Sequence, residues 1–119
     1  MLLIADLAVL VVALLHAWFL ILEMFLWERP LGLKTFGHSP EQASATRVLA
    51  INQGLYNGFL SAGLIYGVVL GEQGFAFKLF FLICVVIAGV VGAVTASRKI
   101  FLVQSLPAII AMALLGLAG

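Results

Sequence analysis

The sequence predicts an all-α fold, an integral membrane four-helix bundle with up-down-up-down topology. Hydrophobic residues make up 65% of the 119 residues and charged residues only 9%, whereas a soluble domain has about 45–50% apolar and about 25% charged residues. Long apolar runs also alternate with short polar breaks, and a soluble chain of this size could not bury so much apolar surface. The chain is therefore expected to form a single domain, residues 1–119, with lipid as its solvent.

Four segments are long and apolar enough to cross a bilayer, which takes about 20 residues. They cover about residues 2–27, 48–70, 75–96 and 100–117. The first break, residues 28–47, contains Pro30 and Pro40 and is predicted to be a loop. The other two breaks, residues 71–74 and 97–99, are short enough to join neighbouring antiparallel helices. The N-terminal run lacks the positive region of a signal peptide and carries Asp6, so we expect a retained helix.

The placement of lysine and arginine predicts the orientation, because cytoplasmic loops carry an excess of these residues. The side of the first and third breaks carries five of them, and the opposite side carries only Lys78. The five are Arg29, Lys34, Arg47, Arg98 and Lys99. We therefore expect both breaks in the cytoplasm and both termini on the non-cytoplasmic side.

Small residues spaced by four predict where helices approach closely in lipid. Gly54 and Gly58 form one such pair in the second segment, and Gly63, Gly67 and Gly71, again spaced by four, follow up to its end. Packing inside one bundle is the interpretation that we favour. A homo-oligomer formed through these glycine-rich faces is the alternative.

Polar residues inside the apolar segments are the candidate ligand-binding site, since each is costly in lipid and calls for a partner or a purpose. Their estimated depths, from 1.5 Å per residue, place polar side chains of three helices in one layer of the cytoplasmic half, with a second tier nearer the midplane. This predicts a polar pocket open or nearly open to the cytoplasm. Asp6 is left out of the pocket, because it lies within two turns of the outer end and can reach water there. The candidate residues are His16, Glu23, Asn52, Gln53, Tyr56, Asn57 and Gln104.

Several functions are consistent with this layer. The first is binding or transport of a small polar or amphipathic molecule, with Glu23 supplying the charge. A membrane-embedded enzyme could instead use His16 as acid or base, but the sequence has no convincing nucleophile–base pair, and the enzyme question stays open. Hydrogen bonding between helices in a purely structural subunit is the third. We expect no metal, no cofactor and no nucleic-acid partner; the single cysteine, Cys84, lies in an apolar run and is interpreted as inert.

Particular runs resemble a family of short bacterial membrane proteins that is catalogued as domain of unknown function 1304. The runs are residues 22–27 (LEMFLW), residues 30–37, residues 52–59 (NQGLYNGF) and residues 103–108 (VQSLPA). The resemblance covers nearly the whole chain and implies four helices in a bacterial inner membrane. It implies no activity and no catalytic residue. Small four-helix proteins similar in size include the DoxX-like group, which leaves a quinone-linked redox protein as a further alternative.

Overall fold

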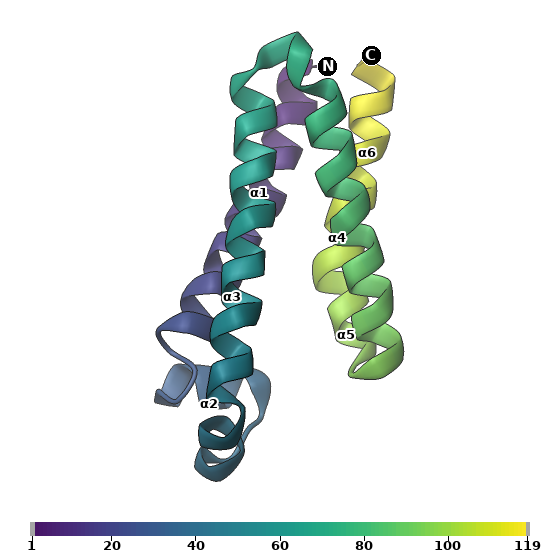
Figure 1. Cartoon of the computed structure of the whole chain (residues 1–119). Helices are drawn as coiled ribbons and strands as arrows, with labels where there is room; N and C mark the ends of the chain where they lie inside the picture. Colours follow the sequence, from purple (N-terminus) through teal and green to yellow (C-terminus); the bar gives the residue numbers. More distant parts are fainter. Residues whose placement is uncertain (1, 119) are drawn as a thin grey trace. The chain divides into compact units, whose positions relative to one another are not determined.

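The computed structural model describes residues 2–118, in which every regular element is helical (Figure 1). The all-α prediction is therefore confirmed. The elements are α1 Leu2–Met24, α2 Pro30–Phe36, α3 Pro40–Val69, the 3-10 turn η1 Gly71–Gly74, α4 Phe75–Thr95, α5 Arg98–Ile100, the π-helical turn η2 Phe101–Ser105 and α6 Leu106–Ala118.

Within residues 2–118, three helices are long and apolar enough to cross a membrane: Leu2–Met24, Gly71–Thr95 and Arg98–Ala118. The 30-residue helix α3 is long enough but is not one of them. The physical reason lies in its sequence, because Asn52, Gln53 and Asn57 interrupt its apolar middle. A helical protein with three helices suited to a membrane is thus established, and the fourth crossing stays a prediction.

The predicted loop over residues 28–47 is wrong for most of its length, because it holds α2 and the start of α3. Pro30 begins α2, and Pro40 begins α3, which suits proline because the first helical N–H needs no partner. Ser39 and Gln42 then form a capping box: Gln42 N–H donates to Ser39 Oγ, and Ser39 N–H donates to Gln42 Oε1. The two prolines therefore start helices in this segment.

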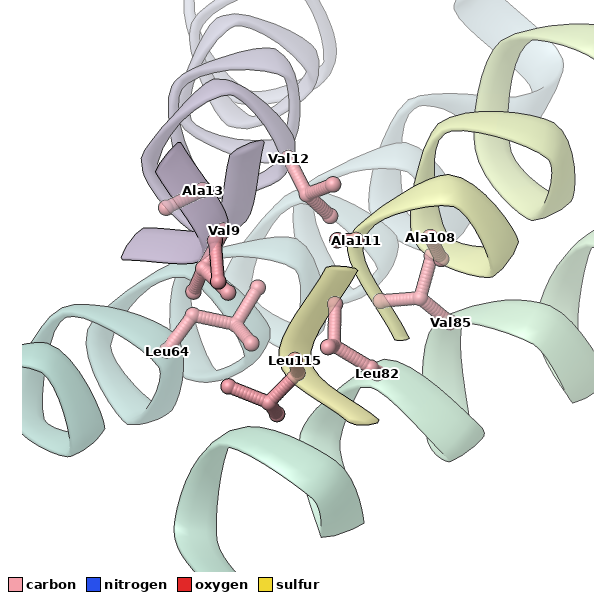
Figure 2. Packing of buried hydrophobic residues seen from close by; sticks show 10 residues of the cluster. Val9, Val12, Ala13, Leu64, Leu82, Val85, Ala108, Ala111 and Leu115 are labelled. Carbon is pink, nitrogen blue, oxygen red and sulfur yellow. The ribbon is translucent and has the colours of Figure 1, made fainter. Parts of the chain in front are cut away.

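The described chain divides into two compact units. The first comprises residues 2–14 and 60–118, and the second comprises residues 15–59. That the chain forms a single domain therefore stays a prediction. Helices α1, α3, α4 and α6 all contribute to the core of the first unit, which Figure 2 shows from close by. Its buried members are Ala5, Val9, Val12, Ala13, Leu64, Leu82, Val85, Ala108, Ala111 and Leu115.

The start of α1, the turn η1 and the end of α6 lie together at one end of the first unit. Leu2, Gly71 and Ala118 line one cavity there, and Figure 1 shows the start of α1 and the end of α6 near this turn. Gly71 has φ +65°, a left-handed conformation that glycine adopts without steric cost. Gly74 packs on Gly67 so closely that a Cβ would stand 1.7 Å from the Gly67 carbonyl oxygen. The turn between α3 and α4 thus depends on these glycines.

The second unit packs the end of α1 and helix α2 against the start of α3. Trp27 joins them, because its Nε1–H donates to Ala43 O at 3.1 Å and to Thr46 Oγ1 at 3.2 Å. The rings of Phe36 and His38 each lie 4.9 Å from the Trp27 ring, centroid to centroid. Trp27, which ends the first apolar segment, therefore connects this end to α2, to His38 and to the start of α3.

Candidate functional site

Glu23 of α1 and Asn57 of α3 lie side by side in the second unit. Asn57 Nδ2–H donates to Glu23 Oε1. Both side chains are buried: Glu23 is 9% exposed and Asn57 is 3% exposed. Asparagine is neutral, so it hydrogen-bonds the carboxyl group without supplying a countercharge. Two of the predicted site residues are thus in direct contact.

Glycine allows α1 and α3 to approach closely at this point. A Cβ on Gly54 would stand 2.5 Å from Met24 Cγ and 3.2 Å from Glu23 Cβ, and one on Gly58 would stand 2.7 Å from Leu20 Cδ1. The small-residue spacing therefore serves packing inside the second unit, where it brings the Asn57 amide within reach of the carboxyl group.

The remaining polar residues of α3 do not share the environment of Asn57. Asn52, Gln53 and Tyr56 are exposed, and the Tyr56 ring lies 6.2 Å from that of Phe59. Helical geometry explains the division, because Asn52 lies about 140° around α3 from Asn57. Asn57 belongs to the face packed on α1, and Asn52 belongs to the opposite side. That these side chains line one pocket stays a prediction.

His16 is fully buried in the second unit, and its ring meets Phe19 edge to face with centroids 5.2 Å apart. Gln104 is half-buried in the first unit. It lies on the π-helical turn η2, where Leu106 N–H donates to Phe101 O five residues back. Pro107, which has no N–H, follows directly. The predicted layer containing Gln104 and Glu23 stays a prediction, since the two residues belong to different units.

The π turn is held against α4 by a serine that the sequence analysis did not single out. Ser105 Oγ–H donates to Val86 O at 2.9 Å, and Ser105 is fully buried. Gly89 lies directly against it, because a Cβ at this position would stand 2.0 Å from Ser105 Oγ. Insertion of one residue into an α-helix produces such a turn, and π turns are frequent at functional sites.

An ion pair is the main feature that the sequence analysis missed. Lys78 Nζ lies 2.9 Å from Asp6 Oδ1, with side-chain exposures of 1% and 20%. Asp6 was expected to reach water on its own; it instead pairs with a lysine of α4. The sequence does contain a signal for this pair, because Asp6 and Lys78 carry opposite charges and both lie within two turns of the same predicted membrane edge. Among residues 2–118, no cluster of three His, Cys, Asp or Glu side chains could hold a metal ion.

These features define a small helical protein whose apolar helices suit a membrane and in which Glu23 pairs with Asn57 and Asp6 pairs with Lys78. The chain belongs to the family described as protein of unknown function DUF1304, whose model matches residues 10–116. It is 30% identical over 105 residues to "Uncharacterized protein YpaA" of Lactococcus lactis subsp. lactis (strain IL1403), covering 87% of this chain and 88% of that protein. No solved structure matches the chain. The family resemblance seen in the sequence is thus confirmed.

Proposed function

We propose that the chain is a bacterial inner-membrane protein in which α3 forms a fourth crossing and both termini lie on the non-cytoplasmic side. At 1.5 Å per residue, the 30 residues of α3 span about 45 Å, more than the hydrocarbon core of a bilayer. The hydrogen bond between Asn57 of α3 and Glu23 of α1 lowers the cost of placing these two polar groups in lipid. Lys78 is the one lysine or arginine that the sequence places on the predicted outer side, and its ion pair with Asp6 neutralises this charge. These observations support the orientation that the loop charges indicate.

Within that arrangement, the function that we propose is the binding of a small polar or amphipathic molecule at the Glu23–Asn57 pair, in the cytoplasmic half of the membrane. Movement of that molecule across the bilayer would be the natural extension in a homo-oligomer.

The observation that supports this proposal is the buried carboxyl group of Glu23. Burial of a carboxyl group in a helix that faces lipid is costly unless it is paired, and Asn57 offers a neutral donor to one of its two oxygens. The second oxygen keeps its capacity to accept a hydrogen bond. A ligand with an ammonium group or with several N–H or O–H donors would complete this environment. If the Glu23–Asn57 pair only linked two helices, two amide side chains would form that hydrogen bond equally well.

The test is a thermal-shift screen of the purified protein against polar metabolites, quinones and lipids, with Glu23→Gln beside the wild type. The amide keeps the volume of the side chain, so the fold should persist. Binding of the ligand should weaken by about 1.5–3 kcal/mol, the scale of a hydrogen bond to a charged group.

The matched control is Glu28→Gln, because Glu28 is an exposed carboxylate five residues further along the chain. Its partner Arg47 lies 3.5 Å away, and both side chains are exposed. Glu28→Gln should bind the ligand as the wild type does. A ligand that stabilises wild type and Glu23→Gln equally would remove Glu23 from the site, and a screen with no ligand would favour a structural role for the pair.

A further inference from the structure

A cavity at the end of the first unit is independent of Glu23 and has its own chemistry. It measures about 260 Å³ and lies where α1 starts, α6 ends and η1 turns into α4. Leu2, Gly71, Glu72, Phe75, Lys78 and Ala118 line it. Since α1, α4 and α6 are apolar enough to cross a membrane, their ends lie at the level of lipid headgroups in the proposed arrangement.

The charged side chains around this cavity lie at different depths. Lys78 is the inner one, because it is almost completely buried and held by Asp6. Its ammonium group has three donors, of which Asp6 engages one. Glu72 is the outer one, since its side chain is exposed on the turn η1. Asp6 and Glu72 contribute two negative charges and Lys78 one positive charge, which leaves a net charge of −1.

The rest of the lining is apolar. Leu2 and Phe75 are 42% and 43% exposed, and each stands at the end of a helix whose body suits lipid. A molecule in the cavity would therefore meet a cation inside, an anion at the rim and apolar side chains alongside. A soluble polar metabolite has no apolar part to contact Leu2 and Phe75, whereas a phospholipid has both a polar headgroup and apolar acyl chains.

We propose that this cavity binds the headgroup of a zwitterionic phospholipid with a primary ammonium group. The ammonium group would hydrogen-bond the Glu72 carboxylate, and a phosphate oxygen would accept from Lys78 Nζ. The acyl chains would run beside Leu2 and Phe75. A quaternary ammonium headgroup has no N–H donor for Glu72, and a headgroup with net negative charge meets the surplus negative charge of the site. The inference rests on the membrane placement proposed above and not on the ligand site at Glu23.

The test measures the melting temperature of the full-length protein in detergent micelles doped with dioleoyl lipids of identical chains. Phosphatidylethanolamine should raise the melting temperature most, phosphatidylcholine less and phosphatidylglycerol least. In Glu72→Gln, the ethanolamine lipid should lose its advantage over the choline lipid, which corresponds to about twofold to fivefold weaker binding for an exposed ion pair. Equal shifts for the two zwitterionic lipids in the wild type, or the largest shift with phosphatidylglycerol, would overturn the proposal.

Three further variants separate the possible outcomes. Glu28→Gln removes an exposed carboxylate outside the cavity, and it should keep the preference for phosphatidylethanolamine. Glu23→Gln should keep it too, so that loss of the Glu23 site and loss of the lipid site are distinguishable. Lys78→Gln should abolish the shift, but it also breaks a buried pair and can fail to fold. Glu72→Gln therefore decides the question, and a preference that survives this change refutes the site.

Discussion

Gly89 of α4 and Ser105 of the π turn η2 are in direct contact, with Ser105 N only 2.9 Å from where a Gly89 Cβ would stand. The serine hydroxyl donates to Val86 O, one turn earlier on α4. The absence of a side chain at Gly89 is thus what lets the π turn approach α4 and make this hydrogen bond.

Replacement of Gly89 by alanine should therefore destabilise the protein. The added methyl group would overlap the backbone of Ser105, and such overpacking costs about 1–3 kcal/mol. Denaturation in detergent, followed by circular dichroism, measures the free energy of unfolding. Gly116→Ala is the control, because nothing lies within 4 Å of a Cβ there and alanine favours a helix. Equal effects of the two changes would contradict this explanation.

Removal of the Asn57 amide should destabilise the protein through Glu23. Asn57→Ala leaves a buried carboxyl group without the donor that the structure gives it, which costs about 1–3 kcal/mol. Asn52→Ala removes an exposed amide from the same helix and should change stability by about 0.5 kcal/mol or less. A double-mutant cycle with Glu23→Gln then measures the coupling of Glu23 to Asn57. A coupling near zero would show that the two groups do not stabilise one another.

Changes to one partner of the Asp6–Lys78 pair should be more costly than changes to both. Lys78→Met leaves the carboxylate without its cation, and breaking a buried pair costs up to about 3–5 kcal/mol, an upper range here because Asp6 is partly exposed. The double variant Asp6→Asn/Lys78→Met should recover part of the loss. Glu28→Gln, in an exposed pair, should cost about 1 kcal/mol or less. Urea titrations of the four proteins would check this order, and a double variant worse than Lys78→Met would contradict it.

The orientation can be tested by cysteine labelling in a Cys84→Ala background. Lys34→Cys and Arg98→Cys should react with a membrane-impermeant maleimide only from the cytoplasmic side, and Gln73→Cys only from outside. All three residues are exposed, so the reagent can reach each of them once it is on the correct side. Labelling of Gln73→Cys from the cytoplasm would invert the proposed topology.

The features that depend on composition and local pattern could be predicted from the sequence. The bodies of α1, α4 and α6 follow from apolar runs of membrane length. Glu23 and Asn57 entered the candidate site because polar residues in such runs are rare, and the structure brings these two together. The start of α3 at Pro40 was predictable in principle, since Ser39 and Gln42 stand at capping-box spacing.

Other features depend on packing that no local pattern encodes. Asp6 and Lys78 are 72 residues apart, and only the approach of α1 to α4 makes them partners. The exposure of Asn52 and the burial of Asn57 follow from which face of α3 meets α1, which helical spacing alone does not decide. The π turn likewise requires Gly89 on another helix, in addition to the nearby Pro107.

The π turn also sets the rotational phase of α6. A π turn carries one residue more than an α turn, so everything after it is rotated by about 100° relative to an uninterrupted helix. Ala108, Ala111 and Leu115 face the core of the first unit in that rotated position. If Phe101–Ser105 formed a plain α-helix with all of its residues kept, these three side chains would turn away from the core together, whereas deletion of one residue would remove the π turn and leave them facing it. The π turn therefore accommodates one extra residue in this short segment while the same side of α6 stays its inner side.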